Sequence, residues 1–184
     1  MNIETKKMSN PGPLGLLSFG MTTVLLNLCN AGILPMTIVI IAMGFAIGGL
    51  AQIIAGIFEF KQGNTFGGTA FTAYGLFWWS LVIILTMAPK GLEADLQSMG
   101  FYLLLWGLFT FFMFIGTLKH NRITQIVFGS LTVLFILLAI GDFTNITFIK
   151  NSAGVVGIFC GLSAIYSAVG QIINAEFGKK IFPL

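Results

Sequence analysis

The sequence predicts an all-α membrane protein with six transmembrane helices, and three observations lead to this fold class. Hydrophobic residues make up 57% of the 184 residues and charged residues only 8%, whereas soluble domains carry about a quarter charged residues. The mean hydropathy is +0.97. Six apolar runs approach or exceed the roughly 20 residues that a helix needs to cross a bilayer, and nearly all charges lie between these runs.

We expect the six helices at residues 13–30, 34–59, 66–88, 99–118, 123–141 and 152–174. Turn formers or polar residues separate them, including Pro35, Gly63, Pro89 and the polar segments 119–122 and 141–151. Loops this short make each helix antiparallel to the next. The chain therefore divides into an N-terminal tail (1–12), a transmembrane domain (13–174) and a C-terminal tail (175–184).

The first span begins at a rigid turn and carries a polar stripe. Pro11 and Pro13 fix φ and lack amide donors, so they suit a helix start, with Asn10 available as a cap. Four residues spaced four, four and three apart then share one face of this helix, namely Phe19, Thr23, Asn27 and Asn30.

The second and sixth spans contain small residues four positions apart, a spacing that lets membrane helices approach closely. The pairs are Gly44 with Gly48, Ala51 with Ala55, and Gly157 with Gly161. The sixth span also repeats the polar spacing of the first, with Ser163, Ser167, Gln171 and Asn174. The two polar stripes could wet both ends of one pore, although such side chains also bond their own helix or join neighbouring helices.

The third span has two unlike faces. Thr65, Thr69 and Thr72 lie on one face, which suits contact with another helix. The opposite face carries Gly67, Phe71, Tyr74 and Trp78, which suit a narrow passage. Asn64 precedes the span and reads as a helix cap, while the free amides at such a helix start also favour an anion.

The fourth and fifth spans are apolar, and the fifth contributes Leu131. Spans one, three and five start on the same side of the membrane. Phe19, Tyr74 and Leu131 lie about six to nine residues from those starts, which is roughly 9 to 14 Å deep. They could meet as a hydrophobic constriction, or they could be ordinary packed core.

The distribution of basic residues predicts the orientation, because Lys and Arg in short loops mark the cytoplasmic side. If both termini are cytoplasmic, the outer loops hold only two basic residues, Lys90 and Lys150. The inner segments then hold seven, namely Lys6, Lys7, Lys61, Lys119, Arg122, Lys179 and Lys180. We therefore expect a multi-pass protein of the plasma membrane with both termini inside the cell.

Several functions are disfavoured by the sequence. No charged residue lies near the middle of a span, because Glu59, Asp142 and Glu176 all fall at predicted ends. This argues against a buried carboxylate relay, an acidic ring or a membrane-embedded enzyme. The only histidine, His120, lies in a basic loop. No soluble domain remains for a nucleic acid or a redox cofactor, and we expect no metal or cofactor.

Several motifs together resemble the acetate uptake transporter family of succinate–acetate permeases. The N-terminal part of the match is Asn10-Pro11-Gly12-Pro13-Leu14-Gly15-Leu16 with Phe19-Gly20, followed by Gly49-Leu50-Ala51-Gln52-Ile53. It continues with Gly63-Asn64-Thr65-Phe66-Gly67 through Tyr74-Gly75, then Ser130-Leu131-Thr132, and Gly161 through Ser163-Ala164-Ile165-Tyr166. The resemblance covers about residues 10–178, with Gly12 standing where Ala is usual.

This resemblance implies a homohexamer in which each six-helix protomer has its own hourglass pore. It implies transport of acetate and related small carboxylates such as succinate, often with a proton. The constriction of the family falls on Phe19, Tyr74 and Leu131. We also assign Gln52, Asn64 and Ala164, which lie in the matching motifs, to the substrate pathway together with the two polar stripes.

Two other classes of function stay open at this stage. A passive channel for the anion, for ammonia or for a small neutral solute would be served equally well by an uncharged lining. A purely structural or sensory membrane protein needs no lining at all.

Overall fold

The computed structural model describes residues 9–184, and all regular secondary structure in this range is helical. The elements are α1 (Gly12–Asn30), α2 (Ile38–Met43), the π-helix η1 (Gly44–Ala51), α3 (Gln52–Lys61), α4 (Thr65–Thr86), α5 (Leu96–Gly116), the 3₁₀ turn η2 (Thr117–Lys119), α6 (Arg122–Thr144) and α7 (Thr147–Glu176). α2, η1 and α3 follow one another without a break and form a single span. The described residues therefore contain six helices long and apolar enough to cross a membrane. The predicted fold class is confirmed.

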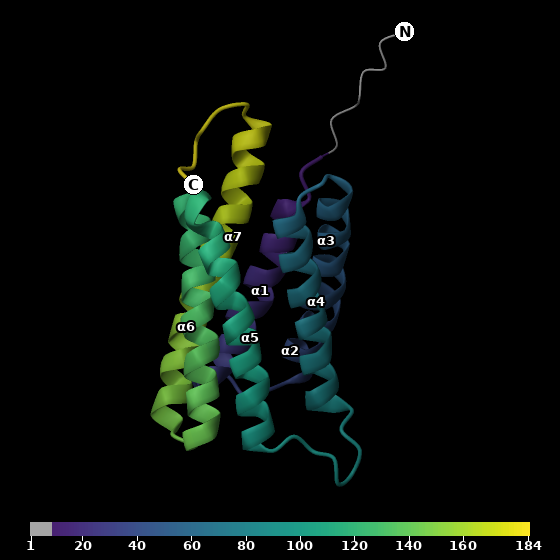
Figure 1. Cartoon of the computed structure of the whole chain (residues 1–184), viewed down its shortest axis with the longest axis vertical. Coiled ribbons are helices and arrows are strands. Elements are labelled where there is room, and N and C mark those ends of the chain that lie inside the picture. Colours follow the sequence, from purple (N-terminus) through teal and green to yellow (C-terminus); the bar gives the residue numbers. More distant parts are fainter. Residues whose placement is uncertain (1–8) are drawn as a thin grey trace.

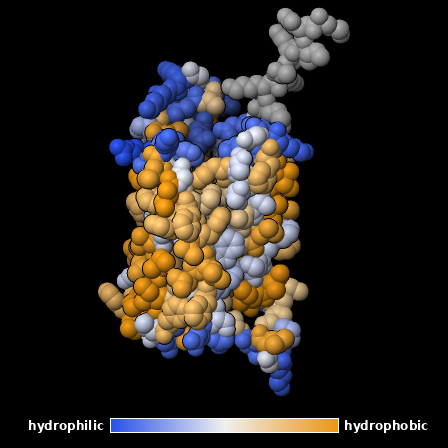
Figure 2. Space-filling model, in the orientation of Figure 1, coloured by the Kyte–Doolittle hydropathy of each residue, from blue (hydrophilic) through white to orange (hydrophobic). Residues whose placement is uncertain are grey.

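The helices run along the long axis of a bundle (Figure 1). The described chain begins at the end where α1 starts, and the C-terminus returns to that end (Figure 1). We call this end the tail end and the opposite one the loop end. A hydrophobic band crosses the middle of the visible face, with hydrophilic residues at both ends (Figure 2). This pattern is the one expected of a protein that spans a bilayer.

Helix boundaries differ from the sequence expectation in two places. The second span begins at Ile38, because the four residues before it are not helical. The expected loop at 141–151 is mostly helix, since α6 continues to Thr144 and α7 starts at Thr147. Asn145, whose left-handed φ of 52° ends α6, makes this turn with a single further residue.

Side-chain caps fix the starts of three helices. Asn64 accepts a hydrogen bond from the amide of Gly67 at the start of α4, and Asn121 accepts one from Thr124 at the start of α6. Asp95 caps α5 by accepting from the side chain and amide of Ser98, which holds the pKa of this carboxyl below its usual range. These caps satisfy amides that the helix itself leaves free.

Glycines let α1 and α7 touch backbone to backbone. A Cβ atom at Gly161 would lie 2.7 Å from the carbonyl oxygen of Gly20, and one at Gly157 would overlap the side chain of Asn27. The small pair predicted in the sixth span therefore forms a close helix contact. The threonine face of the third span also makes a close helix contact, because the hydroxyl of Thr72 fills the space beside Gly56 of α3.

The π-helix η1 packs against two tryptophans of α4. A Cβ at Gly48 would lie 2.8 Å from the indole ring of Trp78, and one at Gly49 would overlap the indole of Trp79. The Trp79 indole N–H also donates to the carbonyl oxygen of Phe45 at 2.9 Å. The wide turn of a π-helix changes the direction of the residues after it, and the first residue after η1 is Gln52.

Candidate functional site

Four cavities follow one another through the bundle, and each shares lining residues with the next. The tail vestibule has a volume of about 360 Å³ and the loop vestibule about 230 Å³. Between them lie two small chambers. The volume that the centre of a water-sized group can occupy is about 20 Å³ in one and about 30 Å³ in the other. We call these the tail-side and loop-side chambers. The series runs from the tail end to the loop end of one chain.

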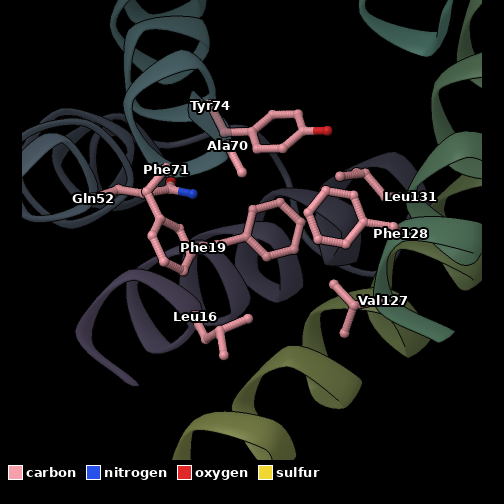
Figure 3. A pocket seen from close by; sticks show the side chains of 9 residues that line it. All are labelled: Leu16, Phe19, Gln52, Ala70, Phe71, Tyr74, Val127, Phe128 and Leu131. Atoms are coloured by element: carbon pink, nitrogen blue, oxygen red, sulfur yellow. The ribbon is translucent and has the colours of Figure 1, made fainter. Parts of the chain in front are cut away.

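Phe19, Tyr74 and Leu131 are the residues that line both small chambers. They come from α1, α4 and α6, and each is at most 6% exposed. The ring centroids of Phe19 and Tyr74 are 6.0 Å apart. The three side chains point toward a common space (Figure 3). These are the three residues that the sequence expected at a constriction, and we call the place where the two chambers meet around them the neck.

The position of Tyr74 is held by a hydrogen-bond relay. Its hydroxyl donates to Oγ1 of Thr110 at 2.9 Å, and Thr110 donates to the carbonyl of Trp106 at 2.7 Å. The rings of Phe109 and Phe128 also pack against Tyr74, with centroids 5.6 and 6.2 Å away. One wall of the neck is therefore fixed by both polar and aromatic contacts.

The tail-side chamber is apolar except for the side chains of Gln52 and Tyr74. Its wall includes Leu16, Phe71, Val127 and Phe128, while Gln52 reaches in from the start of α3 (Figure 3). Gln52 is 1% exposed, and its Oε1 has no hydrogen-bond partner in the described residues. A polar group in such surroundings is stabilised only when something in the chamber bonds to it.

The loop-side chamber is also mostly apolar. Four polar side chains line it, namely Thr23, Asn27, Tyr74 and Trp78. Thr23 is 3% exposed and Trp78 is 4% exposed. Asn27 donates to the carbonyl of Thr23 at 2.9 Å and accepts from Asn30 at 3.0 Å. The polar stripe expected on the first span thus runs along the row of cavities, with Asn30 lining the loop vestibule.

Polar side chains from several elements meet in the tail vestibule. Asn64 donates to Oε2 of Glu59 at 2.6 Å, and Asn10 donates to Oε1 of Gln171 at 3.1 Å. Glu59 is only 5% exposed, although it lies near the end of α3. His120 lines the same cavity, stacked edge-on against Phe66. This vestibule offers mainly amide and carboxylate groups.

The loop vestibule contains an ion pair that the sequence analysis did not predict. Nζ of Lys150 in α7 lies 2.9 Å from Oδ1 of Asp142 in α6. Both residues line the cavity beside Asn30. The pair exists because α6 and α7 both extend into the segment that was expected to be a loop, so its charges face each other across a tight turn.

Four of the expected pathway residues lie elsewhere in the structure. Ser163, Ala164 and Ser167 are buried in α7 and line none of the four cavities. Ser163 donates to the carbonyl of Phe159, and Ser167 accepts from Gln171. Asn174 holds the C-terminal segment, because its Oδ1 accepts from the amides of Ile181 and Phe182. The segment expected as a tail therefore folds back against α7.

Some lining residues were not singled out as pathway residues. Phe71 and Trp78 share the Tyr74 face of the third span, so their helical spacing was a usable signal. Phe128 lies one turn before Leu131 and lines the same chamber. Glu59 carried no comparable signal, since its burial depends on neighbouring helices. No cluster of His, Cys, Asp or Glu able to hold a metal occurs within residues 9–184.

Six helices able to span a membrane and a row of cavities inside one chain define a multi-pass membrane protein. A model of the GPR1/FUN34/yaaH family matches residues 1–180, and the chain belongs to this family. The resemblance seen in the sequence motifs is thereby confirmed.

Named relatives indicate the class of activity. The chain is 54% identical to the succinate-acetate/proton symporter SatP of Escherichia coli K12, over 97% of this chain and 96% of the relative. It is 41% identical to the ammonia transport outward protein 2 of Saccharomyces cerevisiae, over 92% of this chain and 64% of the relative. The solved structure of the bacterial acetate channel SatP matches with a TM-score of 0.94 and 54% identity, over 97% of this chain and 99% of that one. The chain is a membrane transport protein and not an enzyme.

Proposed function

We propose that this chain carries acetate and related small carboxylates, including succinate, across the plasma membrane together with a proton. The observation that carries this proposal is the apolar neck of Phe19, Tyr74 and Leu131 between two chambers that each contain orphaned polar groups. The relatives named as an acetate channel and as a succinate-acetate/proton symporter support the choice of substrate.

The neck and chambers favour the protonated acid over the anion. No Lys, Arg, Asp, Glu or His lines either chamber, and an unpaired carboxylate in such a dry space is strongly disfavoured. The carboxylate instead binds a proton at one vestibule, crosses the neck as the neutral acid and releases the same proton on the other side. The neck then selects by size, and the wider vestibules collect the anion from solution.

The ends of the pathway follow from the orientation expected from the sequence. The tail vestibule, with Asn10, Asn64 and Gln171, opens to the cytoplasm, and the loop vestibule, with Asn30, opens to the outside. Gln52, Thr23 and Asn27 then form the polar steps between them. A homohexamer places six such pathways side by side, and native mass spectrometry of the detergent-purified protein measures that stoichiometry.

Uptake into proteoliposomes tests the proposal. Labelled acetate is expected to enter in a saturable manner and to accumulate when the outside is made acidic, and Tyr74→Ala is expected to disturb both properties because it opens the neck. Protein-free vesicles supply the control, since acetic acid itself crosses lipid. Uptake that is insensitive both to Tyr74→Ala and to an imposed pH gradient contradicts this function.

A passive channel for ammonia or a small neutral solute is the second candidate. Uncharged chambers favour it, and so does the name of the ammonia transport relative. Flux of labelled acetate, succinate and ammonia in the same vesicles separates the candidates. A passive ammonia channel gives non-saturating ammonia flux without accumulation of acetate under a pH gradient.

A further inference from the structure

Orphaned polar atoms are concentrated beside the neck. Within residues 9–184, the buried side-chain atoms without a hydrogen-bond partner are Oγ1 of Thr23, Oε1 of Gln52, Oγ1 of Thr72 and Nε1 of Trp78. Three of these four side chains line the two chambers. A buried donor or acceptor without a partner is destabilising, and native proteins rarely leave one unfilled. The chambers therefore lack bonding partners that an occupant can supply.

The loop-side chamber holds two of the three, and their sequence neighbours make a direct comparison possible. Thr22 donates to the carbonyl of Ser18 at 2.9 Å, whereas Thr23 has no partner for its hydroxyl. Trp79 donates to the carbonyl of Phe45 at 2.9 Å, whereas the indole N–H of Trp78 is unpaired. The missing partners are thus a property of this chamber rather than of the residue types or of the helices that carry them.

We propose that the indole N–H of Trp78 and the hydroxyl of Thr23 form a binding subsite for the carboxyl group of a short-chain acid in its protonated form. This inference rests on the proposed function and adds a specific site to it. The acid carbonyl accepts from Trp78 Nε1, which can only donate, and the acid O–H donates to Thr23 Oγ1, which has free lone pairs. Each of the two orphaned atoms then has a hydrogen-bond partner in one carboxyl group.

The rest of the chamber fits the remainder of a small acid. Its wall is built from Leu26, Leu134, Phe135 and Leu138. The space of about 30 Å³ for group centres corresponds to about two or three water-sized groups. A methyl group beside a carboxyl group fills this space and removes apolar surface from water. Ammonia would leave the apolar wall without a partner, so the chamber favours an acid.

The absence of charge in the chamber decides the protonation state. No ionisable side chain other than Tyr74 lines it, and the Tyr74 hydroxyl already donates to Thr110. A carboxylate would receive two neutral donors and no counter-charge, while the neutral acid pairs with both groups at no charge-burial cost. The subsite thus holds the acid in the form that can pass the neck, directly beside Phe19 and Leu131.

Nuclear magnetic resonance of the full chain in nanodiscs reads the site at the indole. With ¹⁵N-labelled tryptophan the indole signals of Trp78, Trp79 and Trp106 are assigned through Trp→Phe variants. Acetic acid near pH 5, or acetamide as a permanently neutral mimic with one acceptor and one donor group, is expected to shift the Trp78 signal downfield. The Trp79 signal is expected to stay in place, because its N–H is already bonded.

Uptake kinetics supply matched controls. Trp78→Phe and Thr23→Val are each expected to raise the half-saturation concentration for acetate about five- to tenfold, which corresponds to one lost hydrogen bond, and to weaken inhibition by acetamide. Trp79→Phe and Thr22→Val are expected to leave the half-saturation concentration near the wild-type value. Thr23→Ser, which keeps the hydroxyl, is expected to keep the half-saturation concentration close to the wild-type value. Size-exclusion profiles identify any variant that does not fold.

The outcomes separate this site from the proposed function. A wild-type protein that does not take up acetate contradicts the proposed function, while the indole titration still reports on the site. A Trp78 signal that moves no more than the Trp79 signal during titration with acetic acid and with acetamide overturns the subsite. So does a Trp78→Phe, Thr23→Val double variant with unchanged half-saturation, because water then accounts for both groups.

Discussion

Leu131 is the neck residue whose size is easiest to change without disturbing a polar contact. Its side chain is 2% exposed and lines both chambers. Leu131→Ala widens the neck, so uptake of propionate and larger acids relative to acetate is expected to rise by about tenfold, the lower end of the discrimination that an apolar pocket makes against one substrate methylene. Competition assays with labelled acetate measure this ratio. Val133→Ala on the half-exposed outer face of α6 is the control, and an unchanged ratio in Leu131→Ala removes Leu131 as the size filter.

The hydroxyl of Tyr74 is expected to act on stability more than on passage. Tyr74→Phe keeps the ring at the neck and removes one hydrogen bond to Thr110, a loss of roughly 0.6 kcal/mol in membrane helices. Thr110→Val leaves the buried phenol unpaired and is expected to cost about 1–3 kcal/mol. Unfolding in mixed detergent micelles measures both values. Equal losses for the two variants contradict the relay.

The π-helix η1 is expected to tolerate no side chain at Gly49. A methyl group there overlaps the indole of Trp79, which is itself tied to the carbonyl of Phe45. Gly49→Ala is therefore expected to destabilise the protein by about 1–3 kcal/mol, as overpacking does. Thermal unfolding of the purified protein gives this value. Gly129→Ala, whose added carbon first meets the Phe114 ring edge at 3.2 Å, should cost clearly less, and the reverse order contradicts the packing described.

Lys150 and Asp142 are expected to have opposite effects on uptake, because they bring opposite charges to the loop vestibule. Lys150→Met leaves an unbalanced carboxylate there and is expected to slow acetate uptake at low salt by roughly two- to tenfold through repulsion. Asp142→Asn is expected to retain or raise the rate, and the double variant to return close to wild type. Initial rates at two ionic strengths measure these effects. Equal slowing by both single variants would indicate a structural role of the pair instead.

The elements also show what the sequence could and could not predict. Phe19, Tyr74 and Leu131 could be placed level because their helices are regular, so counting residues from each start gives depth. The direction of Gln52 depends on the π-helix before it, and an apolar, glycine-rich run contains no signal that distinguishes a π-turn from an α-turn. Likewise, Asn174 has the spacing of a pore stripe, but its side chain is hydrogen-bonded to the C-terminal segment instead. The sequence spacing does not reveal this contact.

Across the whole molecule, hydrophobicity determines that six helices span the bilayer, while close packing determines which polar side chains line the cavities. The α7 stripe shows the distinction: Gly157 and Gly161 bring α1 so near that Ser163 and Ser167 are enclosed and bond within α7. The α1 stripe lies at the same interface and still reaches the cavities through Thr23, Asn27 and Asn30. Equal spacing therefore gave unequal outcomes.

The distribution of basic residues predicts how the whole molecule is oriented in the membrane. Because seven of the nine basic residues fall at the predicted inner side, the tail end is expected to face the cytoplasm. In a Cys29→Ser background, single cysteines replace the exposed residues Lys90 at the loop end and Lys179 at the tail end. A membrane-impermeant maleimide is expected to label Lys90→Cys in intact spheroplasts and Lys179→Cys only after permeabilisation. The buried Cys160 provides the unlabelled baseline. Labelling in the opposite order would invert the pathway, so that the amide-rich vestibule with Glu59 faces outward and the Lys150 vestibule faces the cytoplasm.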